Sequence, residues 1–378
     1  MKIYIKFIGL ILFLSSCKEE LPISKNKFEK INFEKIPNYN YNIPKYILKD
    51  NSGGVKIDNK KALLGRILFY DRKLSVDNTI SCSSCHIQTI GFSDSLPLSD
   101  GVYNRKTLRH SMRLGYLKFS DEPRYFWDKR ALNLLEQVIS PIQDHNEMGF
   151  SGKENQPNFD SLMLKLNNTN YYTELFDWAY GNDTIITKLK LQTSLIHFIR
   201  SIHSFDSKFD KGLRLTNDIE KPFPNFTDSE NKGKLLFLKN PIFGFDEKRI
   251  SGGAGCAQCH IPPEFNIHPN IKNNGIQYNN NLDLTVTKSP SLRDLYNPEG
   301  FLNSGLTHFG KIKIDTIIEH YNHPKTYLID SIDPKLTYNK QPQNLQLTPK
   351  EKKALKAFLK TLTSIDIYTN EKFTNPFY

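Results

Sequence analysis

The chain has 378 residues, of which 38% are hydrophobic, 12% aromatic and 24% charged, and its formal net charge is +11. This composition excludes an intrinsically disordered chain, and the length suffices for two domains that each bury a core. No run of eighteen apolar residues follows the N-terminus, so the sequence predicts no membrane-spanning helix in the mature chain.

The first sixteen residues predict a lipoprotein signal peptide. Lys2 and Lys6 precede a short apolar stretch, residues 7–14. Two small residues, Ser15 and Ser16, then lead to Cys17. A Cys at this point resembles the lipobox of bacterial lipoproteins, so we expect cleavage before Cys17 and lipidation of its thiol. An ordinary secretory signal with an incidental Cys is the alternative. We therefore expect an exported bacterial lipoprotein, anchored to the outer membrane and facing the periplasm or the cell surface.

Residues 17–55 are rich in Asn, Lys, Tyr and Pro without periodicity, which predicts a tether between the lipid and the fold. Helices are expected where apolar residues recur at helical spacing behind a capping residue. The expected helices begin at Asp58, cover 131–139 up to Pro141, cover 187–203, follow the capping box Thr227–Glu230, and follow the capping box Thr348–Glu351. No strand pattern is comparably strong, so we expect a mostly α fold.

A weak internal repeat relates two of these helices. Leu-Gly-Arg-Ile-Leu-Phe at 64–69 is echoed by Lys-Gly-Lys-Leu-Leu-Phe at 232–237, and each copy precedes a C-x-x-C-H motif. The repeat predicts two helical domains. Their join is expected between Phe205 and Asn225, where Pro222 and Pro224 interrupt the apolar pattern.

The two C-x-x-C-H motifs carry the chemistry of the chain. In such a motif the two thiols add to the vinyl groups of haem, and the adjacent imidazole becomes the proximal iron ligand. Two copies predict two covalently bound c-type haems. The predicted attachment and ligand residues are Cys82, Cys85 and His86 in the first motif and Cys256, Cys259 and His260 in the second.

Two other interpretations of the cysteines remain open. Two C-x-x-C pairs can hold one zinc through four thiolates, but such pairs usually lie within a few tens of residues and these are 174 apart. A redox dithiol in each pair would leave the adjacent His without a role. Four of the five cysteines belong to the motifs, so only Cys17 remains and no structural disulfide is expected.

The basic excess of the chain is modest. Loss of residues 1–16 removes two lysines and lowers the charge from +11 to +9, and four ionised haem propionates would lower it to about +5. The lysines are dispersed, so they indicate a solvated surface or a patch that steers an acidic electron-donor protein. Nucleic acid is not an expected partner.

Several short motifs together resemble the bacterial di-haem cytochrome c peroxidase family over residues 61–363. The matching stretches are 64–71, 80–86, Gly91–Asp94, Phe126–Ala131, Glu136–Gln137 with Pro141–Ile142, Glu147–Gly149, Pro290–Arg293 and Ile318–Asn322. The resemblance implies two cytochrome-c-like helical domains, each with one covalent haem. We assign a peroxidatic domain to 56–205, an electron-transfer domain to 206–365 and a C-terminal tail to 366–378.

The resemblance also assigns roles to side chains. It places the peroxide-binding haem on His86 and the haem that receives electrons on His260. Glu147 matches the active-site glutamate of the family, Gln137 its partner and Trp127 the tryptophan between the haems. Chemistry agrees for Glu147, because cleavage of the O–O bond needs a group that moves a proton from one oxygen to the other. Without the resemblance, these three residues would be a solvated Glu, a helix-surface amide and a core aromatic.

Two departures from the family pattern concern the sixth iron ligands. Leu302 stands where many relatives have a Met that ligates the second haem, so His308 or Tyr296 replaces it or the site is open. The loop 100–105 lacks the displaceable His of relatives that need reductive activation. His110 is then either a substitute ligand or a structural residue. The resemblance further implies a Ca²⁺ ion between the domains, whose ligands we do not place.

These observations predict a cytochrome-c peroxidase-type oxidoreductase that reduces hydrogen peroxide to water. The expected electron donor is a small redox protein of the cytochrome c or cupredoxin type, and a homodimer is a further expectation. One alternative is a di-haem electron-transfer cytochrome without peroxidase activity. Another resembles the di-haem enzyme that matures methylamine dehydrogenase, an oxidase of a partner protein.

Overall fold

A computed structural model describes residue 28 and residues 31–181, 185–276, 285–303, 313–324 and 329–377. The predicted signal peptide, Cys17 and His308 lie outside these residues. Helices dominate the described part, as predicted, and its strands form three separate two-stranded antiparallel pairs. The helices are α1 Asn59–Tyr70, α2 Cys82–Cys85, α3 Leu134–Gln143, α4 Phe159–Asn167, α5 Asn170–Tyr180, α6 Lys188–Ser201, α7 Lys208–Thr216, α8 Asp228–Leu238, α9 Ile314–Asn322, α10 Pro349–Lys360 and α11 Asp366–Thr369. The pairs are β1 Pro241–Phe243 with β2 Arg249–Gly252, β3 His260–Ile261 with β4 Asn266–Ile267, and β5 Thr337–Tyr338 with β6 Gln341–Pro342.

Four of the five predicted helix starts are confirmed. The carboxylate of Asp58 accepts hydrogen bonds from the first backbone N–H groups of α1, and Thr187 caps α6 in the same way. Reciprocal capping boxes open α8 at Thr227 and α10 at Thr348. Each cap satisfies N–H groups that have no partner inside the helix.

The helix expected over 131–139 differs from its prediction. Helix α3 begins at Leu134 after the N-cap Asn133, and it continues through Pro141 to Gln143. The predicted stop at Pro141 is wrong, because a proline so near the end removes only the bond to the Gln137 carbonyl. The continuation carries the chain to Asp144 and then to the loop that holds Glu147.

The internal repeat corresponds to two equivalent helix crossings. Gly65 of α1 faces α6, where an added Cβ would lie 1.9 Å from the carbonyl oxygen of Ser194. Gly233 of α8 faces α10 in the same way, 1.9 Å from the carbonyl oxygen of Ala354. Only glycine allows backbones to approach this closely. The repeated glycine therefore sets the helix crossing in both halves.

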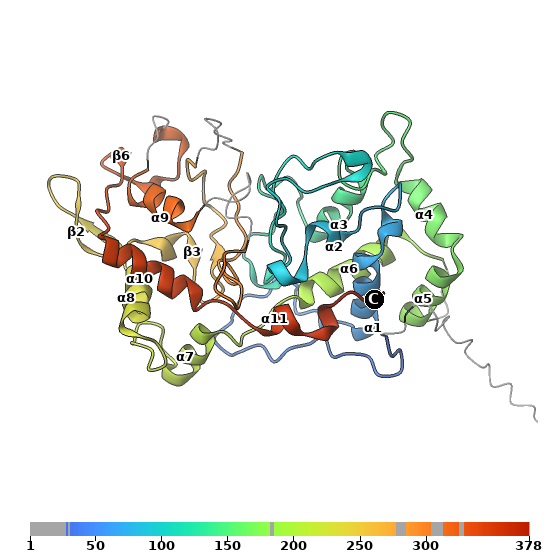
Figure 1. Ribbon diagram of the computed structural model, residues 1–378, viewed down its shortest axis with the longest axis horizontal. Coiled ribbons are helices and arrows are strands. Elements are labelled where there is room, and N and C mark those ends of the chain that lie inside the picture. The colour runs from blue at the N-terminus through green and yellow to red at the C-terminus, as the bar shows by residue number, and fades with distance from the viewer. Residues whose placement is uncertain are drawn as a thin grey trace, which may run out of the picture.

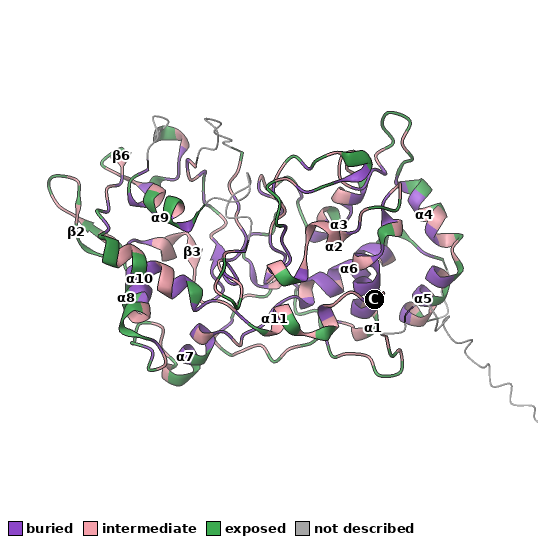
Figure 2. Ribbon diagram, in the orientation of Figure 1, coloured by how far each residue is buried: buried purple, intermediate pink, exposed green. Residues whose placement is uncertain are grey.

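Two hydrophobic clusters form the core. The first takes buried residues from α1 to α6, and the second takes them from α7 to α10. Figure 1 shows the corresponding halves side by side, with α1–α6 in blue to green and α8–α10 in yellow to red. In Figure 2 the buried residues of each half line the facing sides of its helices.

Parts of both terminal segments belong to the first cluster. Tyr39 is fully buried there, Phe28 and Ile47 nearly so, and the Tyr39 hydroxyl donates to the carbonyl of Lys372. The described part of the segment predicted as a tether thus packs against the fold, because its aromatic and apolar side chains find a hydrophobic surface. Residues 366–373 run back from the second half to the first, as the red ribbon of α11 shows in Figure 1.

Candidate functional site

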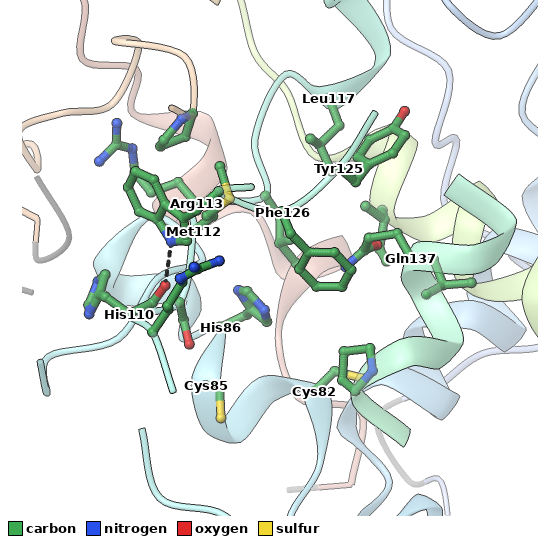
Figure 3. A pocket seen from close by; sticks show the side chains of 18 of the residues that line it. Cys82, Cys85, His86, His110, Met112, Arg113, Leu117, Tyr125, Phe126 and Gln137 are labelled. Carbon is green, nitrogen blue, oxygen red and sulfur yellow. Dashed lines mark hydrogen bonds between the residues drawn. The ribbon is translucent and has the colours of Figure 1, made fainter. Parts of the chain in front are cut away.

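The first C-x-x-C-H motif folds as the short helix α2 and the residue after it. Ser84 Oγ accepts from the backbone N–H of Ser81 at 3.0 Å, and the N–H of His86 donates to the Cys82 carbonyl at 3.0 Å. This turn places both thiols at one edge of a cavity with the His86 imidazole between them (Figure 3). The two cysteines are not joined by a disulfide.

The His86 ring is prepared to ligate iron. Its Nδ1 lies 3.0 Å from the Phe92 carbonyl oxygen, so Nδ1 carries the proton and Nε2 keeps a free lone pair. Burial lowers the pKa of His86 to about 4, which keeps the ring neutral. Two free thiols beside a neutral imidazole of this tautomer fit a covalent c-type haem.

The cavity at this motif has a volume of about 500 Å³, within the size range of cofactor sites. Glu147, Gln137 and Trp127 all line it, so the structure brings the three predicted catalytic residues to the same cavity as the first motif. They come from different elements: Gln137 from α3, Glu147 from the loop after α3, and Trp127 from the loop before it.

Glu147 is a carboxyl group with an altered acidity. Its backbone N–H donates to Asp144 Oδ1 at 3.1 Å, which fixes the loop. Burial, followed by the negative charge of Asp144, raises the pKa of Glu147 from 4.5 to about 7. A carboxyl group with this pKa can both accept and donate a proton near neutral pH.

Gln137 offers the cavity an unused acceptor. Its side-chain oxygen Oε1 is buried and has no hydrogen-bond partner in the described part of the chain. Figure 3 shows the amide pointing from α3 into the cavity. Buried amide oxygens are normally paired, so an unpaired one on a cavity wall indicates that its partner is a bound molecule.

Trp127 is held rigidly between the two halves. It is 5% exposed, and its indole Nε1 donates to the carbonyl of His110 at 2.8 Å, the bond dashed in Figure 3. Its side chain lines both the first cavity and a second cavity at the other motif. The structure therefore places Trp127 in the wall between the two sites.

The structure gives both ring nitrogens of His110 hydrogen-bond partners. Its Nε2 lies 3.1 Å from Ser93 Oγ, and its Nδ1 lies 2.8 Å from the Leu96 carbonyl oxygen. Both ring nitrogens are thus occupied and the side chain is only 2% exposed. These contacts favour the structural role of His110, and the ligand role considered from the sequence stays a prediction.

The second motif begins in a 3₁₀ turn, Cys256–Gln258, and ends at His260 in β3. Cys256, Cys259 and His260 line the second cavity, of which the described residues enclose about 180 Å³. Burial, followed by the positive charge of Arg113, lowers the pKa of His260 to about 4. The two thiol pairs lie in separate cavities, so the arrangement excludes one zinc bound by all four cysteines.

Of the two sixth ligands expected for the second haem, Tyr296 is not brought to this cavity. Tyr296 and Leu302 pair through an isolated β-bridge, and neither lines the second cavity among the described residues. His308 lies outside the described residues. In the described part of the chain no group of three or more His, Cys, Asp or Glu side chains is arranged to hold a metal ion; calcium stays a prediction.

Sequence reasoning missed four polar residues of the cavity walls. Arg130 lines the first cavity and lowers the pKa of Glu147, an effect smaller than that of burial. Arg113, Lys288 and Ser289 line both cavities. Arg130 lies within the matched run Phe126–Ala131, and Lys288 and Ser289 directly precede the matched run Pro290–Arg293, a signal that could have drawn attention to these three residues.

Comparisons with known proteins agree with this geometry. Residues 59–218 match the family model described as di-haem cytochrome c peroxidase. The methylamine utilization protein MauG of Methylorubrum extorquens is 26% identical over 319 residues, covering 80% of this chain and 78% of MauG. Cytochrome c551 peroxidase of Nitrosomonas europaea is 30% identical over 209 residues, covering 53% and 52% of the two chains.

The fold has solved counterparts. The crystal structure of a MauG-like protein associated with microbial copper homeostasis covers 90% of this chain and 99% of its own, with a TM-score of 0.68 and 24% identity. The diheme peroxidase BthA from Burkholderia thailandensis has a TM-score of 0.61 at 20% identity, covering 85% and 90% of the two chains. The motifs, the cavities and these matches relate this chain to the di-haem cytochrome c peroxidase family, whose model matches residues 59–218.

Proposed function

We propose that this protein reduces hydrogen peroxide to water with electrons from a small redox protein, as a di-haem c-type cytochrome peroxidase. Peroxide, two protons and two electrons give two water molecules. The observation that carries the proposal is Glu147, whose pKa of about 7 places a proton-transfer group in the cavity of the first motif. A protein that only carries electrons has no need of such a group.

The side chains that line the first cavity have different roles in this reaction. Covalent haem, when bound at Cys82 and Cys85, would supply redox-active iron in this cavity. Glu147 moves a proton between the two oxygens of the substrate, and Gln137 Oε1 accepts a hydrogen bond from it. Trp127 closes the wall toward the second cavity and supplies a rigid aromatic contact between the two sites.

The proposal includes the organisation expected from the sequence. Each half holds one covalent haem, on residues 56–205 and 206–365. It also includes export as a lipoprotein acylated at Cys17, which fits covalent haem because c-type haem is attached outside the cytoplasm in bacteria. No helix among the described residues has the length and apolarity needed to cross a membrane.

An oxidase of a partner protein is the second proposal. Two MauG relatives, 26% and 27% identical to this chain, each match 80% of it. Leu302 in place of the expected Met ligand also favours this alternative.

One experiment on exported protein tests the proposals. Mass spectrometry after denaturation should show two covalent haem additions, and peroxide should then oxidise a reduced small cytochrome or cupredoxin catalytically. Bound zinc or free thiols would refute the haem sites. Two haems without turnover of any donor, together with peroxide-driven oxidation of a partner protein, would favour the oxidase.

A further inference from the structure

Arg113 occupies an unusual place in the wall between the two cavities. Its side chain lines both of them, and it is 5% exposed. Trp127, Ser289 and Pro290 line the same shared wall. A positive charge at this position acts on both sites at once.

The guanidinium of Arg113 is only partly satisfied. Its Nη2 donates to the Ser291 carbonyl at 2.8 Å, but its Nε and Nη1 are buried without a hydrogen-bond partner in the described part of the chain. No described carboxylate forms an ion pair with it. Arg113 senses Tyr368 and then Asp294. Oδ1 of Asp294 accepts hydrogen bonds from the N–H and hydroxyl of Ser364, its Oδ2 is buried without a partner among the described residues, and burial raises its pKa to about 6.

A buried guanidinium with two unpaired nitrogens would be stabilised by a bound anion. Arginine stays protonated in proteins, and an uncompensated buried charge carries a large desolvation penalty. Its planar fork of N–H donors matches a carboxylate, and Nε and Nη1 point along different edges of the fork. Two carboxylates can therefore approach it from different sides.

A second unsatisfied donor lies in the same wall. The hydroxyl of Ser289 is buried without a partner among the described residues, and Ser289 lines both cavities. Lys288 also lines both, but its ammonium already donates to the carbonyls of Glu122 and Arg124. The free donors are thus Arg113 and Ser289, and both face space assigned to the cofactors.

We propose that Arg113 binds propionate carboxylates of the haems in both cavities, with Ser289 as a supporting donor, and so sets the reduction potentials of the two haems together. The inference rests on the proposed binding of two haems. A positive charge beside a haem stabilises the reduced state, which carries one more electron. Loss of the charge should therefore lower both potentials.

The test uses the full-length holoprotein and two matched variants. R113Q removes the charge from the shared wall. R66Q removes an equally buried charge, 5% exposed, whose Nε and Nη2 bind Thr374 and which lines neither cavity. Mass spectrometry first establishes two haems per chain, and spectroelectrochemical titration then gives both potentials as a function of pH.

We expect R113Q to lower each reduction potential by at least about 59 mV. For a one-electron couple this shift is a tenfold change in the ferrous-to-ferric ratio at a fixed potential. The wild-type potentials should be flat around neutral pH, because Arg113 holds the carboxylates ionised. In R113Q the freed carboxylates should titrate nearer neutrality, so both potentials should fall as pH rises. R66Q should match the wild type.

Several outcomes would overturn the inference. Potentials and pH profiles of R113Q equal to those of the wild type would do so, as would a shift confined to one haem. Wild-type potentials that depend on chloride concentration would show that a small anion is the partner. If R113Q does not fold, R113K is measured in its place. One lysine ammonium cannot reach both carboxylates, so the potential of at least one haem should fall. Unchanged potentials in R113K refute the proposal. A wild type without two haems would refute the proposed function, and this inference with it, before any potential is measured.

Discussion

Arg293 and Asp210 form a bidentate ion pair in which both side chains are fully buried. Nη1 and Nη2 of Arg293 each lie 2.9 Å from a carboxylate oxygen of Asp210. Arg293 also donates to the Pro263 carbonyl, and its guanidinium lies 5.3 Å from the ring centre of Tyr116 in the first half. The pair therefore joins α7 to the loop after the second motif and touches the first half.

Breaking this pair should destabilise the protein strongly. Asp210→Asn leaves the guanidinium of Arg293 buried without a counter-charge, so the free energy of unfolding should fall by about 3–5 kcal/mol. Denaturant titration of the holoprotein measures the change. Asp121→Asn is the control, because Asp121 pairs with Lys49 at 2.8 Å on the surface and should contribute no more than about 1 kcal/mol. Equal losses in both variants would contradict the assignment.

The glycine at each helix crossing should not tolerate a methyl group. Gly65→Ala and Gly233→Ala each place a Cβ against a backbone carbonyl of the facing helix, and overpacking of this kind costs about 1–3 kcal/mol. Gly115→Ala is the control, because its Cβ would meet only ordinary contacts at 3.8 Å or more. Thermal unfolding should show lower midpoints for the first two variants alone.

Glu147→Gln should reduce peroxide turnover by about 10²- to 10⁴-fold, the usual contribution of a general acid–base group. Both haem spectra should stay nearly unchanged, because the substitution keeps the size of the side chain. Glu154→Gln is a control on an exposed carboxylate of the same loop region that does not line the cavity. Turnover close to wild type in Glu147→Gln would remove this residue from the mechanism.

The raised pKa of Glu147 also predicts a pH dependence of stability. The folded state keeps the proton up to a pH of about 7, whereas an unfolded glutamate loses it near 4.5. The unfolded state is therefore favoured increasingly as pH rises between these values, and the penalty is constant above them. Relative to Glu147→Gln, the wild type should lose stability from about pH 4.5 to about pH 7. Denaturant titrations across this range give the difference, and a flat difference would refute the shift.

The iron coordination can be tested by spectroscopy. Both nitrogens of His110 are occupied, and the loop 100–105 contains no His. We therefore predict a five-coordinate first haem that reacts with peroxide in the fully oxidised protein. Leu302→Met should raise the potential of the second haem, because Met ligation raises it, and His308→Ala should change its spectrum if His308 is the ligand. Oxidised protein that is entirely low-spin and inert to peroxide until half reduced would contradict this.

Local signals in the sequence determined the helices and the haem motifs. Asp58, Thr227 and Thr348 fix helix starts because a cap needs only its own neighbours in the chain. The spacing of Cys82, Cys85 and His86 likewise acts within one turn. Pro141 misled the prediction, because its effect depends on how many helix bonds remain beyond it.

The tertiary structure alone decided what surrounds those motifs. Gln137, Trp127 and Glu147 owe their common cavity to the path of α3 and its loops, and without the family resemblance no local pattern brings them together. The raised pKa of Glu147 follows mainly from its burial in the folded protein. The hydrogen bond between His110 and Ser93 forms only when the chain folds back on itself. Arg113 gives no signal within its own stretch of sequence. Its place between the cavities arises only when the two halves pack, because burial and charge pairing are properties of the assembled fold.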